Sequence, residues 1–314
     1  MNKIVKRYWV EPFHVVVMNN SYQVIEINRS NDSNFVITNI QHTVYKYNPG
    51  FWDDGAPFPG IGGDRNLIFL KFDRPGTSEL IYPNIPAMQS AGDGKQPTIL
   101  LEPQILEKNT SMKITVYNNS GIDIYFDLVL EGYLSDVIYT YERDEDFILY
   151  KREAMVPFAP VGGTATIINS TFGISYPIFN PNDTCTFRIK GTPEYIMEIY
   201  GLTVNYNLAE MFEVTRIQAN SKYFKMTGIV SPNRNTEAAL ELLAGDARFP
   251  HFLPTSNAAN TYCFIELQDA TDVLEIDVIC RYWGASNYPL LLNAMIIKNY
   301  IDQEKYNRMK VIKK

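Results

Sequence analysis

The chain has 314 residues, a formal net charge of −7 and an aromatic fraction of 13%, mostly Tyr and Phe. Its length allows one large domain or two of ordinary size, and its aromatic residues favour strands. The acidic balance argues against nucleic-acid binding over the whole surface. No run of eighteen apolar residues is present to span a membrane. Residues 1–13 lack the apolar stretch and cleavage site of a secretory signal.

Alternation of apolar and polar residues predicts strands through the first half of the chain. Two loops rich in Gly and Pro, 48–64 and 75–96, interrupt them, and such long loops often serve as interaction surfaces. About eight strands with long loops between some of them predict a Greek-key sandwich such as a jelly roll. The predicted strands are 8–17, 22–28, 35–47, 66–72, 98–101, 112–117 and 122–133.

The clearest strand pair is the predicted hairpin over 113–133, KITVYNNSGIDIYFDLVLEGY. Asn and Gly at 118–121 suit a turn because both residue types tolerate positive φ. A related pattern, strand, polar turn and strand, returns at 261–282. The segments FVITNIQ at 35–41 and FEVTRIQ at 212–218 precede the two hairpins in the same order. We interpret these echoes as two copies of one β domain in a single chain.

The predicted organisation is all-β, with two tandem jelly-roll or Greek-key β-sandwich domains. The first domain covers residues 1–140, a charged linker with Pro and Gly covers 141–163, and the second domain covers 164–284. One short helix is expected in the second domain at 236–244, where Asn235 caps its start and Gly245 ends it. The predicted strands of the second half are 164–168, 172–178, 184–189, 195–205, 212–218 and 223–229.

A second helix is expected at the C-terminus, over residues 285–314, because apolar residues recur there at mostly helical spacings. From position 298 onward the segment carries six Lys or Arg against two acidic residues. Three interpretations stay open for this basic amphipathic segment. It packs on the second domain, lies on an anionic membrane, or contacts packaged nucleic acid.

No catalytic, cofactor-binding or metal-binding residues are predicted. The run GIGGD at 60–64 lacks the following Lys-Ser/Thr of a phosphate loop and the strand–helix–strand frame of a dinucleotide site. Cys185, Cys263 and Cys280 form no CxxC pair, the three histidines are scattered, and no GxSxG occurs. We therefore expect no enzyme and no zinc site. Cys263 and Cys280 fall on adjacent predicted strands and are expected to be buried, and the cysteine content predicts assembly in a reducing cytoplasm.

Two groups of residues are candidates for interaction with other molecules. Trp52 beside Asp53 and Asp54 is the kind of surface that binds carbohydrate or calcium, although a turn with solvated acids has the same composition. The second group is the set of basic residues in the C-terminal segment. Its members are Lys298, Lys305, Arg308, Lys310, Lys313 and Lys314.

Two tandem β units with long loops, a late helix and a basic end together resemble the double jelly-roll capsid proteins of tailless, internal-membrane bacteriophages. Residues 8–133 and 164–282 carry the resemblance, and 236–244 looks like the helix that flanks barrels in that family. The resemblance implies a major capsid protein whose homotrimer forms a pseudo-hexameric capsomer of an icosahedral shell. It implies a virion location after assembly in the host cytoplasm. One departure is that the first domain shows no flanking helix.

A second resemblance competes with the first. The run ILLEPQILEKNTSMKITVYNNSG at 99–121 and the later LVLEGY are similar to β-sandwich head and tail structural proteins of tailed phages. That resemblance implies an auxiliary, ring or decoration protein. A carbohydrate-binding protein that recognises a receptor through Trp52 is a third alternative. The expected partners are further copies of the chain, other virion proteins, and an internal membrane or packaged genome reached through the basic C-terminus.

Overall fold

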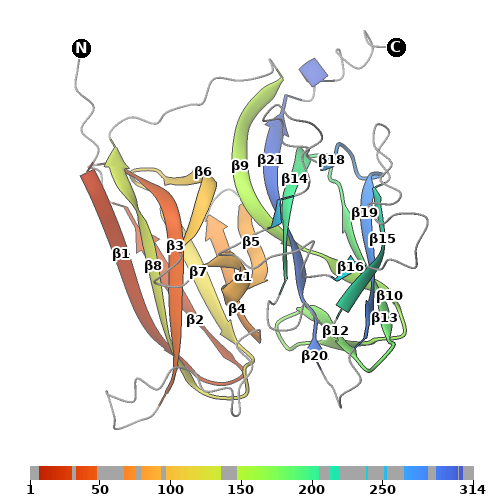
Figure 1. The fold of residues 1–314 in the computed structure, drawn as a ribbon. Coiled ribbons are helices and arrows are strands. Elements are labelled where there is room, and N and C mark those ends of the chain that lie inside the picture. The colour runs from red at the N-terminus through yellow and green to blue at the C-terminus, as the bar shows by residue number, and fades with distance from the viewer. Residues whose placement is uncertain are drawn as a thin grey trace.

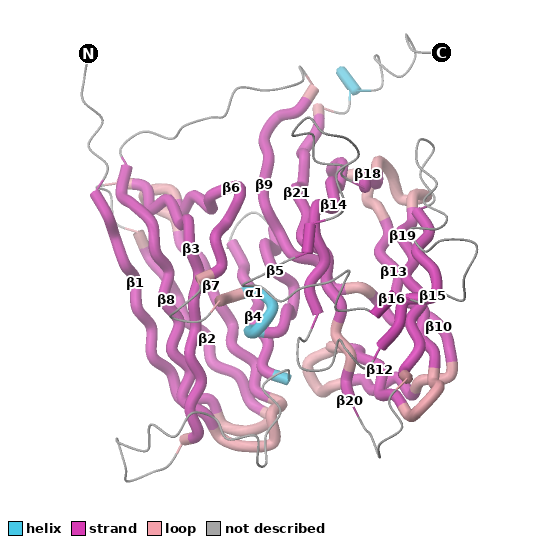
Figure 2. Tube along the Cα trace, in the orientation of Figure 1, coloured by secondary structure: helices cyan, strands magenta, loops and turns pink. Residues whose placement is uncertain are grey.

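The computed structural model describes residues 7–29, 33–47, 67–74, 79–92, 97–135, 147–204, 212–219, 238–239, 251–252, 265–281, 288–302 and 304–306. Most of these residues lie in strands, and Figures 1 and 2 show two groups of strands standing side by side. The all-β fold class predicted from the sequence is confirmed.

The first sandwich contains eight strands in two four-stranded sheets. One sheet has the order β1-β8-β3-β6, and the other has the order β2-β7-β4-β5. The short helix α1 (Ala87–Ser90) connects β5 to β6. The strands are β1 (Arg7–Val17), β2 (Ser21–Asn28), β3 (Asn34–Lys46), β4 (Ile68–Arg74), β5 (Glu79–Pro86), β6 (Thr98–Leu106), β7 (Ser111–Asn118) and β8 (Ile124–Ser135).

The strand pairing in this sandwich follows one simple rule. The first strand pairs with the eighth, the second with the seventh, the third with the sixth and the fourth with the fifth, all antiparallel. Additional pairs β3–β8 and β4–β7 join these ladders into the two sheets. A long hairpin folded over itself gives this order, which is that of a jelly roll.

Side-chain alternation places the core between the two sheets. Every second residue along most of β8 is buried, including Phe126, Leu128 and Leu130. Complete burial of each such side chain contributes about 1.5–3 kcal/mol. The turn before β8 is fixed by Asn118, whose Nδ2 donates hydrogen bonds to the carbonyls of Val17 at 2.9 Å and Ile122 at 2.8 Å. Gly121 follows at a φ of +91°, which glycine adopts readily.

The second sandwich repeats the same pairing rule. Strand β9 pairs with β21, β13 with β19, β14 with β17 and β18, and β15 with β16. Pairs β14–β21 and β15–β19 complete its two sheets, and β10 extends one of them beside β13. A further small sheet has the order β11-β12-β20. The strands are β9 (Ile148–Pro157), β10 (Ala159–Gly163), β11 (Thr166–Asn169), β12 (Ser175–Phe179), β13 (Thr184–Lys190), β14 (Tyr195–Val204), β15 (Phe212–Ala219), β16 (Ala238–Ala239), β17 (His251–Phe252), β18 (Ile265–Leu267), β19 (Val273–Cys280), β20 (Tyr288–Pro289) and β21 (Leu292–Ile301).

The two sandwiches also share a local irregularity. In the pair β3–β8 the register shifts at Thr38, and in the equivalent pair β14–β21 it shifts at Tyr200. Each neighbouring edge strand then carries a proline at the matching place, Pro12 in β1 and Pro157 in β9. Proline suits an edge strand because a position whose N–H would face the open side loses no ladder hydrogen bond. Matching pairing, bulge and proline are what an internal duplication predicts.

The C-terminal helix predicted for 285–314 is wrong over Leu292–Ile301, which form the central strand β21. One face of β21 points into the second sandwich and the other points toward the first, as Ile296 and Ile297 show by joining different cores. A strand buried on both faces lacks polar alternation, so its short apolar run resembles a buried helix. Residues 304–306 are helical, as expected.

Two other boundaries differ from the prediction. The linker expected at 141–163 contains β9 and β10, because the charged run at 151–153 hides a strand that belongs to the second sandwich. The helix expected at 236–244 lies mostly outside the described residues, and Ala238–Ala239 within it form the short strand β16.

Candidate functional site

Of the residues that the sequence singled out for interactions, Lys298 and Lys305 are the two that lie among the described residues. Trp52, Asp53 and Asp54 lie outside the described residues, as do Arg308, Lys310, Lys313 and Lys314. Lys298 lies in β21, is only 7% exposed, and holds its Nζ 5.1 Å from the centroid of the Tyr195 ring. Lys305 is exposed, with its Nζ 3.9 Å from a carboxylate oxygen of Asp302. Lys298 therefore belongs to the packed interior and not to an open basic surface.

The described residues hold no group of three or more His, Cys, Asp or Glu placed to bind a metal ion. Across the same part of the chain, no helix is long and apolar enough to cross a membrane. Cys185 and Cys280 are buried, and the burial of Cys280 is as the sequence predicts. Cys263 lies outside the described residues. Burial, with a smaller effect from Asp277, raises the pKa of the Cys185 thiol to about 12, so this thiol stays protonated and is a poor nucleophile.

The junction between the two sandwiches is extensively buried. The side of the first sandwich formed by β5, β6 and α1 packs against the sheet β9-β21-β14, as Figure 1 shows. Met155, Tyr200, Met295 and Ile297 project from that sheet into the core of the first sandwich. One continuous apolar cluster therefore holds the two sandwiches as a single body.

A buried polar contact centres on Gln89 of α1. Its Nε2 donates a hydrogen bond to the carbonyl of Leu291 at 3.0 Å, and its Oε1 accepts from Thr203 Oγ1 at 3.4 Å and from Asn293 Nδ2. All three side chains are buried. Because a buried polar group without a partner is costly, this contact favours one relative placement of the two sandwiches.

A second buried contact centres on Glu153 of β9, which is 2% exposed. Its carboxylate accepts a hydrogen bond from the Tyr200 hydroxyl, and its backbone carbonyl accepts one from Gln104 Nε2 of the first sandwich at 2.9 Å. Burial, together with the negative charge of Glu153, raises the pKa of Tyr82 well above its ordinary value. A carboxylate held this way stays in place only while both sandwiches surround it.

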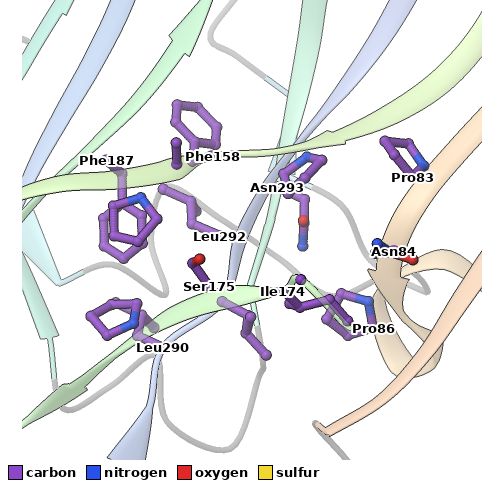
Figure 3. Close-up of a pocket in the computed structure, with 16 residues that line it drawn as sticks. Pro83, Asn84, Pro86, Phe158, Ile174, Ser175, Phe187, Leu290, Leu292 and Asn293 are labelled. Atoms are coloured by element: carbon purple, nitrogen blue, oxygen red, sulfur yellow. The ribbon is translucent and has the colours of Figure 1, made fainter. Parts of the chain in front are cut away.

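A pocket of about 360 Å³ opens where β5 of the first sandwich meets the second. Figure 3 shows Pro83, Asn84 and Pro86 facing Leu290, Leu292 and Phe158 across it. Most of its lining is proline and aliphatic side chain, and it has no charged residue. Such a lining offers packing and the Ser175 hydroxyl, but it contains no acid or base to activate that hydroxyl.

The outward faces of the two sandwiches differ in chemistry. On the second sandwich, Arg188 bonds Glu275 at 2.6 Å, and Arg216 bonds both Glu275 at 3.1 Å and Asp277 at 2.6 Å. These half-exposed charges balance one another along the strands. The outward face of β1 and β8 instead combines aromatic and aliphatic side chains with Glu131 and one ion pair. His14 stacks on Tyr125 at 5.2 Å and pairs with Asp127. This second face is the better candidate for contact with another protein.

Sequence reasoning missed the junction residues. Gln89 and Glu153 are polar residues in segments assigned to a loop and a linker, and nothing in their spacing marks them as buried. A partial signal existed in the apolar run at 290–297, which is too continuous for a strand with one wet face.

Neither a protein-family model nor a curated protein sequence matches the chain. Among solved structures, the STIV MCP is similar over 94% of this chain and 97% of its own, with 10% identity and a TM-score of 0.37. The plant receptor-like kinase ANX1 is similar over 92% and 84%, with 9% identity and a TM-score of 0.21. The CBM22-1-CBM22-2 tandem domain of Paenibacillus barcinonensis Xyn10C is similar over 95% and 97%, with 8% identity and a TM-score of 0.21. Similarities this distant do not support an argument about function. The functional argument comes from the geometry of the chain itself.

Proposed function

We propose that this chain is a virion structural protein, a major capsid protein that self-associates through a trimeric capsomer into an icosahedral shell. One observation carries the proposal. A single chain holds two jelly rolls with the same strand pairing, fixed side by side by a continuous core and buried polar contacts. A rigid pair of repeated modules suits a structural protein that functions by binding other copies through its surface.

The proposal has no catalytic step. The junction contacts of Gln89 and Glu153 serve to hold the modules in one orientation, which a lattice of repeated contacts requires. The protein would be assembled in the host cytoplasm and located in the virion, beside other virion proteins. The alternatives of a ring or decoration protein and of a carbohydrate-binding protein at Trp52 gain no specific support from the described residues.

The test is to express the full chain alone and image the purified product by negative-stain electron microscopy. Capsomer-sized particles with three-fold symmetry, or closed shells, are the expected result. Rings of another order would move the function to a ring or decoration protein. A protein that stays a single compact particle under every assembly condition would contradict a capsid role.

The basic C-terminus is proposed to face the inside of the shell, toward membrane lipid or packaged genome. Because β21 extends to Ile301 and Tyr306 packs against Phe147, a deletion that tests this idea must begin after Tyr306. Removing residues 307–314 should leave folding intact and reduce binding to anionic vesicles or to DNA. Unchanged binding to both would contradict the proposed inner contact.

A further inference from the structure

Equivalent sheet faces in the two sandwiches have very different surroundings. The shared bulge aligns them, because Trp9 pairs with Gly132 beside the first bulge and Ala154 pairs with Ile296 beside the second. On this alignment Tyr8 of β1 corresponds to Glu153 of β9.

The exposed fractions of equivalent side chains in the two sheets differ sharply. Tyr8 is 72% exposed, whereas Glu153 at the equivalent position is 2% exposed. Val10 is 37% exposed, whereas its equivalent Met155 is 2% exposed. In β8, Tyr133 is partly exposed and corresponds to the buried Ile297 of β21. The second sheet is covered over the positions at which the first is open.

The cover on the second sheet comes from one side of a jelly roll. It consists of β5 and β6, the fifth and sixth strands of the first sandwich, and of α1 between them. Residues 240–250, which stand at the corresponding place in the chain order of the second sandwich, lie outside the described residues. The sequence Ala-Gly-Asp occurs at 91–93 and again at 244–246. The described residues therefore contain one junction already made and one equivalent face left open.

A contact between the face of one module and the side of another is heterologous. In a two-fold contact both copies use the same surface, but here two different surfaces meet, so each copy keeps one of the two surfaces unoccupied. Repeating the contact therefore gives a closed ring or an open filament. The open face also has interface chemistry, since Tyr side chains are enriched at protein contacts. Its two acidic residues already have partners, because Asp127 pairs with His14 and Glu131 accepts hydrogen bonds from Gln41 and Asn39. These features favour another copy of the same chain as the occupant.

We infer that the outward face of β1, β8 and β3 binds the second sandwich of a neighbouring copy, and that this contact repeats the junction within the chain. The inference rests on the proposed function and specifies the surface through which the copies associate. Tyr8, Val10 and Tyr133, near the Arg7 end of β1, are the apolar residues assigned to it. Their burial by the neighbour would match the burial of Glu153, Met155 and Ile297 within the chain.

The first experiment compares Val10→Glu with the matched variant Val24→Glu. Both valines are exposed on edge strands of the same sandwich, but Val24 lies on β2 in the opposite sheet. Val10→Glu should raise the dissociation constant of the oligomer by about tenfold or more, while Val24→Glu leaves it near the wild-type value. Sedimentation velocity over a concentration series measures both. Equal effects of the two variants, or no effect of either, would overturn the assigned surface.

Circular dichroism checks that Val10→Glu is folded, and Tyr8→Glu, at a more exposed position, repeats the test if it is not. The second experiment replaces Tyr8 with a photo-crosslinking phenylalanine analogue in a mixture of isotope-labelled and unlabelled copies. Cross-links from position 8 should reach residues 147–302 of a different copy. Cross-links to the first sandwich of another copy would overturn the inference.

These outcomes separate the surface from the function. If Val10→Glu associates normally and the protein still forms capsomers, the surface is wrong and the capsid role stands. If the wild-type protein never associates, the capsid role itself fails.

Discussion

Replacing Gln89 with Met tests whether the buried polar contact at the junction stabilises the molecule. Met has nearly the same length and shape, so the change removes hydrogen bonds without leaving a large cavity. The carbonyl of Leu291 and the amide of Asn293 would each lose a buried partner. Leaving a buried polar group unsatisfied costs about 1–3 kcal/mol, so the free energy of unfolding should fall by roughly 2–5 kcal/mol.

Equilibrium unfolding of the full chain in urea, followed by circular dichroism, measures this change. Gln23→Met is the matched control because Gln23 is an exposed residue of β2, and its effect should stay within about 0.5 kcal/mol. If Gln89→Met is no more destabilising than Gln23→Met, the polar contact does not hold the two sandwiches together and the reasoning fails.

Three further predictions test other parts of the structure. Gly132→Ala should destabilise the protein by about 1–3 kcal/mol or more, because an added Cβ would lie 1.9 Å from the Val36 carbonyl oxygen. In the control Gly162→Ala, the added Cβ meets nothing within 4 Å. Thermal unfolding compares the two variants, and equal melting temperatures would contradict the packing around β8. Tyr200→Phe removes the hydroxyl that donates a hydrogen bond to the buried Glu153 carboxylate. The free energy of unfolding, measured in urea, should fall by about 1.5–3 kcal/mol. An unchanged urea midpoint would show that this hydrogen bond does not stabilise the protein. Folding raises the pKa of the Cys185 thiol from 9.0 to about 12, so the unfolded chain loses this proton first and the free energy of unfolding falls as pH rises from about 9 to 12. Between pH 8 and pH 11, the free energy of unfolding should fall less for Cys185→Ala than for the wild-type protein. An identical decrease in both proteins would refute the assignment.

Much of the fold could be predicted because one-sided strands leave a strong pattern. In β8, alternation between buried Phe126 and Leu128 and the half-exposed Asp127 marks the strand and its inward face directly. The prediction failed for a strand that has no solvent-exposed face. Strand β21 faces two cores, so Leu292, Met295 and Ile297 are buried together with the residues between them, and the pattern resembles a helix.

The candidate site was harder to predict for a different reason. Whether Glu153 or Lys298 is exposed depends on which module packs against the strand, and that is set by contacts between residues far apart in the sequence. The residue type alone predicts a wet surface for both, although both are buried. The open face of β1 became visible only when its exposed residues could be compared with their buried equivalents in β9.

The most direct test of self-association is the molar mass of the purified full-length protein by light scattering, at low and moderate salt. The capsid role predicts a mass near three times the 36.0 kDa of one chain, stable across the concentration series. A mass that stays at one chain even at high concentration would contradict the central claim.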